Sequence, residues 1–293
     1  MDISDPFVQQ RWRELREMQR EDARARERDA NLRAVTADLR IRLADSYLRD
    51  GQIPRAIAEY KRAIKLDKGN GIYQTRLADA YVMAEDIPSA MTIYQRAIQM
   101  DPELAEPRSS LGDLYMRYGM FWHAVEHYRA AVRLEPERAF YRYQLGDILH
   151  RVGKAREALD ELTEAAVLAP KTAFYRFRLA TLYQQLDQRE AAYTHMCIAC
   201  RAAPHDDYYL VRLAGLAMAT NRRANAVAYL RQAIALRPRN DGYRRLLAEA
   251  YRLTGHDDEH AALCRRVGQL GAYDEEFVTR RLGEWNMRSA WDA

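Results

Sequence analysis

The sequence contains few of the residues that interrupt regular secondary structure, with only 13 glycines and 9 prolines in 293 residues. A β-protein of this length needs many tight turns, and such turns depend on glycine and proline. We therefore expect a mainly helical chain. Cysteine is also rare: Cys197, Cys200 and Cys264 cannot all pair with one another, and they do not suggest a secreted disulfide scaffold.

Long apolar segments are missing as well. No uninterrupted apolar run approaches the roughly 20 residues that a membrane-spanning helix needs. The segment from Met1 to Pro6 has no basic region followed by an apolar one, so it does not resemble a signal peptide. These features predict a cytoplasmic protein without membrane insertion.

The residues that are abundant suit amphipathic helices, since 48% of the chain is hydrophobic and 30% is charged. The net charge of +4 is a mild excess and does not indicate a nucleic-acid-binding protein by itself. Lysine occurs only at positions 61, 65, 68, 154 and 171, so arginine supplies almost all of the 46 basic residues. Arginine favours paired contacts with carboxylates and stacking on aromatic rings.

An internal repeat of 34 residues runs through most of the chain. It is marked by a leucine followed by a small residue, at Leu43-Ala44, Leu77-Ala78, Leu111-Gly112, Leu145-Gly146, Leu179-Ala180, Leu213-Ala214 and Leu247-Ala248. An alanine follows 13 residues after the leucine in six of these units, then a bulky residue four later and a small residue three after that. Proline closes five units, at positions 102, 136, 170, 204 and 238.

Each mark has a physical reading. The spacings of three and four place the leucine on one face of a first helix and the alanines on one face of a second. Gly51, Gly119, Gly153, Gly255 and Asn221 lie between the two helices, where a left-handed residue commonly ends a helix. Each unit therefore predicts a helical hairpin that buries its apolar face by stacking on its neighbours.

This pattern resembles the tetratricopeptide repeat. The resemblance implies an all-α fold, a right-handed α-solenoid of helix-turn-helix repeats with an N-terminal helical extension and a C-terminal capping helix. The seven expected repeats are 37–70, 71–104, 105–138, 139–172, 173–206, 207–240 and 241–274. One departure is that the fourth position, usually aromatic in the family, carries Arg40, Gln74, Arg108, Arg142, Arg176, Leu210 and Arg244.

Segments 1–36 and 275–293 flank the array. Residues 5–36 predict one long charged helix with a short apolar side that includes Phe7, Trp12 and Leu15. This helix is either a solvated extension or a docking segment for a partner, a second copy or the chain's own groove. The C-terminal segment predicts a capping helix followed by a tail with Trp285 and Trp291, which either packs on the last repeat or docks elsewhere.

Two short strings resemble catalytic or metal-binding motifs. His123-Ala-Val-Glu-His127 matches a metallopeptidase string, but both histidines lie beside packing residues of a second helix and no third ligand is evident. Cys197-Ile-Ala-Cys200 lacks the second pair of a zinc site and the histidine of a haem attachment. No phosphate-binding or nucleophile motif occurs. We therefore expect no catalytic residues, no metal and no cofactor.

The resemblance implies that the first helices line a concave groove through their second, fifth, ninth, twelfth and thirteenth positions. The ninth positions include an aspartate row: Asp45, Asp79, Asp113 and Asp147. This row favours a ligand that carries lysine or arginine, and Asp79 is the strongest single candidate because Met83 replaces the cation found one turn later in the other three units. The alternative is that Asp45, Asp113 and Asp147 only neutralise the arginines four residues later.

The second and fifth positions become apolar in repeats four to six. They are Phe140, Tyr143, Phe174, Phe177, Tyr208 and Val211, and they predict an exposed binding patch on the concave wall. The alternative is that neighbouring repeats bury them.

Together these features predict a non-enzymatic scaffold or adaptor that binds a peptide or helix with apolar or aromatic and basic residues. One alternative is a self-assembling subunit, as a homo-oligomer or within a larger complex, that uses the N-terminal helix or the tryptophan tail. Another is RNA or DNA binding through Arg42, Arg76, Arg178 and Arg212, which the aspartate row disfavours because it repels phosphate.

Overall fold

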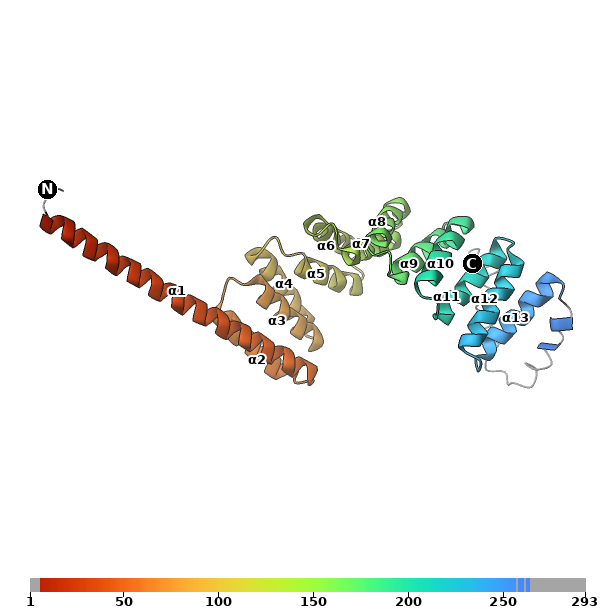
Figure 1. Ribbon diagram of the computed structural model, residues 1–293, viewed down its shortest axis with the longest axis horizontal. Coiled ribbons are helices and arrows are strands. Elements are labelled where there is room, and N and C mark those ends of the chain that lie inside the picture. The colour runs from red at the N-terminus through yellow and green to blue at the C-terminus, as the bar shows by residue number, and fades with distance from the viewer. Residues whose placement is uncertain (1–5, 257, 261, 264–293) are drawn as a thin grey trace. The chain divides into compact units, whose positions relative to one another are not determined.

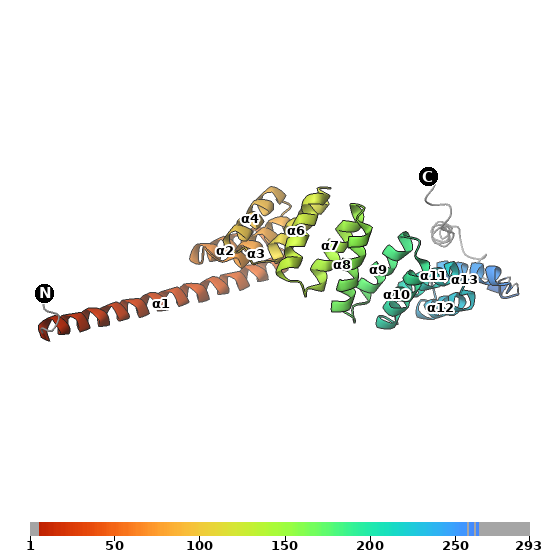
Figure 2. The ribbon, with the colours of Figure 1, turned by 90° about the horizontal axis from the view of Figure 1, so that it is seen from above.

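The computed structural model describes residues 6–256, 258–260 and 262–263, and the regular secondary structure in these residues is entirely helical. Figure 1 and Figure 2 show the helices in chain order. Their bounds are α1 Pro6–Arg49, α2 Ile53–Leu66, α3 Gly71–Met83, α4 Ile87–Met100, α5 Glu106–Arg117, α6 Phe121–Leu134, α7 Ala139–Arg151, α8 Ala155–Leu168, α9 Ala173–Gln185, α10 Arg189–Ala202, α11 Asp207–Ala219, α12 Arg223–Leu236 and α13 Asp241–Thr254.

These helices form antiparallel hairpins that stack in sequence order, α1 to α6 in one group and α7 to α13 in another. The chain divides into two compact units, Met1–Glu135 and Pro136–Ala293. Among the described residues, the first unit holds the hairpins α1–α2, α3–α4 and α5–α6, and the second holds α7–α8, α9–α10, α11–α12 and the first helix, α13, of a further repeat. The expected α-solenoid fold is confirmed within each unit.

The predicted extension and the first helix of repeat one are one continuous helix, α1, of 44 residues. Figures 1 and 2 show that α2 lies beside only its C-terminal part. Side chains from Met18 to Val35 are exposed, as expected for a charged extension. Phe7, Trp12 and Leu15 belong to the part of α1 whose side chains are not described. Trp285, Trp291 and the expected capping helix lie outside the described residues.

Every described hairpin turn contains a residue with positive φ at the same position of the 34-residue unit. Four are the predicted glycines and one is Asn221, but the other two are Glu85 (φ 61°) and Asp187 (φ 56°). The next backbone amide then bonds to a carbonyl five residues back, as Asp86 N does to Tyr81 O at 3.0 Å. This is the helix-ending arrangement in which a left-handed residue satisfies terminal carbonyls, and it repeats in all seven units.

The small residues of the period lie where helices cross. Ala44, Ala78 and Ala180 are at most 1% exposed, and glycine replaces them in repeats three and four. A Cβ added to Gly112 would come within 2.7 Å of the Tyr128 ring. The second-helix tyrosine therefore occupies the space that the missing side chain leaves open.

The arginine at the fourth position joins the two helices of a hairpin where the family usually has an aromatic side chain. Arg40 forms an ion pair with Glu59 at 2.8 Å, and Glu59 is 6% exposed. Arg142 forms the equivalent pair with Glu161 at 3.0 Å. In repeat five the partner is His195, with 3.3 Å between Arg176 Nη1 and His195 Nδ1. The departure in the sequence thus has a structural partner 19 residues later in the same hairpin.

Candidate functional site

Aromatic rings form a row of two contacting groups along the first helices α7, α9 and α11 of the second unit. Tyr143 on α7 meets Phe174 on α9 edge to face, with ring centroids 5.0 Å apart. Phe177, one turn later on α9, meets Tyr208 on α11 at 5.7 Å and stacks on Tyr209 at 5.1 Å. Phe140, 6.5 Å from Tyr143, starts the row. We call this row the aromatic ladder, comprising Phe140, Tyr143, Phe174, Tyr175, Phe177, Tyr208 and Tyr209.

The ladder has an exposed layer and a supporting layer. The rings at the second position of each repeat are exposed, with Phe140 at 46%, Phe174 at 39% and Tyr208 at 39%. Tyr143 and Phe177, at the fifth position, are half-buried. Val211, which the sequence placed with them, is only 2% exposed and packs in the core. It belongs to the buried cluster against which Phe177 and Tyr209 pack, and it is not accessible to a ligand.

The fifth position is buried wherever its side chain is small enough to be covered. Ile41, Thr75 and Ser109 are 7%, 1% and 4% exposed, like Val211. Tyr143 and Phe177 are larger and remain partly accessible. The predicted patch therefore has two parts. One is the fifth-position rings, which are too large to be fully covered between neighbouring hairpins, and the other is the exposed rings of the second position.

Asp147 and Arg178 lie beside the ladder. Arg178 on α9 forms an ion pair with Asp147 on α7, and its guanidinium lies 5.9 Å from the centre of the Tyr143 ring. Asp147 also pairs with Arg151 at 3.1 Å, as the spacing of four residues predicts. Asp147 is 9% exposed, and two arginines offset the cost of burying its charge.

The other aspartates of the row have a partner that the sequence analysis did not identify. The hydroxyl of Tyr94 donates to Asp79 at 2.5 Å, and Tyr128 donates to Asp113 at 2.5 Å. Tyr60 donates to Asp45 in the same way. The signal was present in the sequence, because an Asp and a Tyr recur 15 residues apart in the first three repeats. Repeat four has Leu162 in place of the tyrosine, and its Asp147 is held by arginines.

Burial raises the pKa of the Asp79 and Asp113 carboxyls, and in each case the tyrosine hydrogen bond opposes that rise. Both side chains are half-buried. A carboxylate can accept several hydrogen bonds, so the bond from the tyrosine hydroxyl does not use all the acceptor sites of Asp79. Its predicted role as a ligand contact stays a prediction.

The two motif-like strings are packed into helix surfaces. The rings of His123 and His127 both stack on Tyr115, with centroid distances of 5.2 and 5.3 Å. Burial, and next the nearby Arg108, lower the pKa of His127. Burial raises the pKa of the Cys200 thiol to about 12, which disfavours a reactive thiolate. Within the described part of the chain, no three His, Cys, Asp or Glu side chains are grouped so that they could hold a metal ion.

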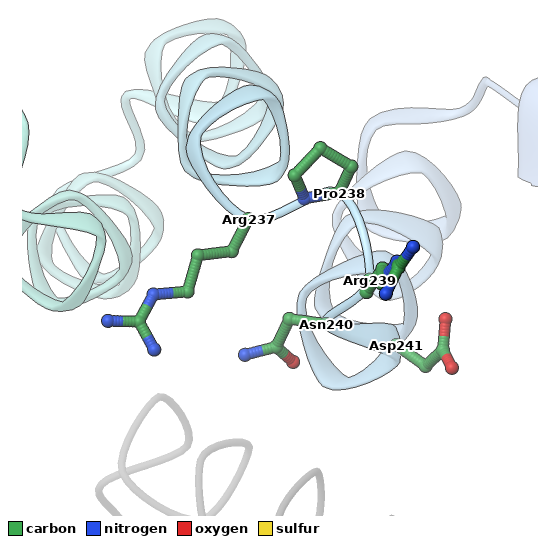
Figure 3. Close-up of a pocket in the computed structure, with 5 residues that line it drawn as sticks. All are labelled: Arg237, Pro238, Arg239, Asn240 and Asp241. Carbon is green, nitrogen blue, oxygen red and sulfur yellow. The ribbon is translucent and has the colours of Figure 1, made fainter.

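A surface hollow at the turn between α12 and α13 is built from polar groups that hold the turn together (Figure 3). It is lined by Arg237, Pro238, Arg239, Asn240 and Asp241. Arg237 pairs with the buried Asp207 at 2.8 Å, and the side chain of Asn240 accepts from Tyr243 N at the start of α13. These contacts give the hollow a structural role.

None of the described helices is long and apolar enough to cross a bilayer.

Stacked helical hairpins with a ring-lined row of first helices define an α-solenoid repeat protein. The tetratricopeptide repeat family matches residues 41–105 and, separately, residues 208–240, so the chain carries repeats of this family. No curated protein sequence matches the chain.

Solved structures are similar in fold. The chain is 20% identical to pilF of Pseudomonas aeruginosa, with a TM-score of 0.60 over 74% of this chain and 99% of that one. PilW, a type IV pilus biogenesis factor, is 18% identical with a TM-score of 0.59, covering 72% of this chain and 98% of that one. YrrB, a tetratricopeptide repeat protein with a peptide-binding site, is 20% identical with a TM-score of 0.52, covering 62% and 93%. At these identities the similarity concerns the fold alone.

Proposed function

We propose that the protein is a non-enzymatic adaptor that binds a peptide or helix segment along the aromatic ladder of repeats four to six. The observation that carries this proposal is the exposure of Phe140, Phe174 and Tyr208 on three successive first helices. Aromatic rings that are backed by other rings and remain open to solvent are typical of interaction hot spots. The YrrB structure is described as having a peptide-binding site, which supports the same use of this fold.

The ladder favours a ligand segment with apolar or aromatic side chains. Its rings present edges and faces to an incoming side chain, and such pairs contribute about 0.5–1.5 kcal/mol each beyond the area that they bury. In the first unit, Asp45, Asp79 and Asp113 favour lysine or arginine in a ligand that contacts them. This second preference is weaker, because Asp147 is paired with two arginines and Asp45, Asp79 and Asp113 each accept from a tyrosine.

Nucleic-acid binding through the first-helix arginines has less support. Arg42 pairs with Asp38 at 3.0 Å, Arg178 pairs with Asp147, and Arg212 donates to Gln184 at 2.9 Å. Contacts of this kind compete with phosphate for the guanidinium groups.

The test begins with peptides selected against the full-length protein from a random display library. Their affinities are then measured for Phe140→Ala and Phe174→Ala, two substitutions of exposed rings that are not needed for the core. Loss of a hot-spot ring typically costs about 2 kcal/mol or more, so we expect each variant to weaken binding roughly 30-fold or more.

Tyr118→Ala is the matched control, because Tyr118 is a 60% exposed ring on the turn between α5 and α6 and does not belong to the ladder. Asp79→Lys tests the aspartate row with the same peptides. Selected peptides that bind both ring variants and Asp79→Lys as tightly as the wild type would contradict the proposal.

A further inference from the structure

The leucine that marks each repeat is buried everywhere except in the first repeat. Leu43 is 43% exposed, whereas the six equivalent leucines are buried, with Leu77 at 5%, Leu111 at 0%, Leu145 at 2%, Leu179 at 0%, Leu213 at 2% and Leu247 at 6%. Within a unit this leucine packs on the preceding hairpin, as Leu77 does in the cluster that contains Ala37 and Tyr60. Repeat one has no hairpin before it among the described residues, yet it keeps the apolar residue.

Leu43 continues an apolar row along α1. Leu32 is 66% exposed, Val35 58% and Leu39 59%, and with Leu43 they are spaced by three, four and four residues. This spacing places all four on one face of the helix. We call these four residues the open stacking stripe. It lies opposite the buried face of α1, where Ala37, Ile41 and Ala44 join the core of the α1–α2 hairpin.

We propose that the open stacking stripe binds the same stripe of a second copy of the chain, with the two α1 helices antiparallel. The stripe is nearly symmetric about its middle: antiparallel pairing places Leu32 opposite Leu43 of the partner subunit and Val35 opposite the partner's Leu39. A surface that matches itself in this way is what a two-fold symmetric dimer requires.

Charge argues against the parallel arrangement. Glu21 and Arg28 lie on the same face of α1 as the stripe, and both are exposed. In a parallel pair each residue meets its own copy, so these positions would bring like charges together. In the antiparallel pair Glu21 lies beyond the end of the partner's α1, and Arg28 does not meet its own copy.

The paired region is long enough for a specific interface. With Leu32 opposite Leu43, and with α1 ending at Arg49, the two helices overlap over residues 26–49. That overlap is roughly 36 Å long at about 1.5 Å per residue. An interface of this length falls near the lower end of specific interfaces, which bury about 1,200 Å² in total. We therefore expect a dimer that dissociates in the micromolar range.

The first experiment measures the molar mass of the full-length protein by sedimentation velocity over a range of concentrations up to tens of micromolar. The test variant is Leu32→Glu/Leu39→Glu, which alters two exposed side chains and leaves the hairpin core intact. We expect the wild type to dimerise and the variant to raise the dissociation constant at least about 100-fold, because pairing would bury four carboxylates.

Ala23→Glu/Ala30→Glu is the matched control. Both alanines are exposed on the side of α1 away from the stripe, so the variant adds the same two negative charges elsewhere. A monomeric wild type would overturn the proposal, and so would a dimer that is weakened equally by both double variants.

The second experiment tests the orientation. A spin label at Arg24→Cys, in a chain whose three native cysteines are alanine, reports the distance between the two copies. Antiparallel pairing places residue 24 opposite residue 51 of the partner, which separates the labels by roughly 40 Å. Labels roughly 10 Å apart would show parallel helices and would overturn the antiparallel arrangement.

Discussion

The tyrosines at the middle of α2, α4 and α6 are among the most completely buried large side chains of the first unit. Tyr60, Tyr94 and Tyr128 are at most 2% exposed, and each places its hydroxyl on an aspartate of the facing helix. The ring fills the space between two helices while the hydroxyl satisfies a carboxylate that neighbouring repeats partly cover. Each tyrosine therefore both packs between the helices and supplies a hydrogen bond to the aspartate carboxylate.

Tyr94→Phe separates these two contributions. The ring is kept, but Asp79 loses its donor in a half-buried position. A hydrogen bond to a charged group contributes about 1.5–3 kcal/mol, so we expect the free energy of unfolding to fall by about that amount. Chemical denaturation followed by circular dichroism measures the change. Tyr118→Phe, on an exposed ring, is the control, and an equal effect of both substitutions would show that the Tyr94 hydroxyl has no special role.

At the scale of the helical element, the pairing of the fourth position with a residue 19 positions later joins first and second helices. The partner is an acid in repeats one and four and His195 in repeat five. His195 stacks on Tyr183 with centroids 5.2 Å apart, and burial, followed by the charge of Arg176, lowers its pKa. In repeat three, burial and Arg108 lower the pKa of the equivalent His127.

These two histidines predict a pH dependence of stability. Their pKa values in the folded protein lie below the ordinary value of 6.5, so the folded state favours the neutral ring. The part of the folding stability that depends on these two neutral rings is fully present above pH 6.5. It is lost as the pH falls from there through the lowered pKa values, because the unfolded chain binds the protons more readily. His127→Gln/His195→Gln should reduce the loss in denaturant midpoint between pH 7 and pH 5. His205→Gln, on an exposed side chain, should leave that loss unchanged.

The sequence predicted the helical hairpins well, because a strict period of 34 residues marks helix faces, turns and ends together. It did not predict left-handed residues at Glu85 and Asp187, since a side chain normally disfavours that conformation and only the neighbouring repeats reveal the position. Val211 was assigned to the exposed patch because helix register places it beside Tyr143 and Phe177. Helix register does not predict how much of a side chain the next hairpin covers. At the fifth position, the size of the side chain determines how much of it stays exposed.

At the scale of the whole molecule, the hairpins within each unit pack mainly on their sequence neighbours, and each of the two units contains its own clusters of buried residues. The energy of such an array is approximately a sum of hairpin and neighbour terms. Damage in one hairpin is therefore expected to spread only a short way along the chain.

Leu111→Ala tests this locality. Leu111 is fully buried in a cluster with Tyr94 and Leu114, and removing such a side chain typically costs about 2–5 kcal/mol. We expect faster hydrogen exchange in α4, α5 and α6, with α11 and α12 nearly unchanged, as measured by mass spectrometry. A uniform increase along the chain would show that the array unfolds as a single cooperative block.

The arginine pairs within the hairpins also constrain how such an array can evolve. A crossover between two repeats that falls at the proline-containing junction exchanges whole hairpins and keeps Arg40, Arg142 and Arg176 with their own acid or histidine. A crossover inside a hairpin separates them: joining α7 to the second helix of repeat two would set Arg142 against Ile93 in place of Glu161, and the half-buried guanidinium would lose its carboxylate partner. The complete hairpin is therefore the unit that can be exchanged intact. We expect chimaeras joined at the prolines to fold and chimaeras joined within a turn not to fold.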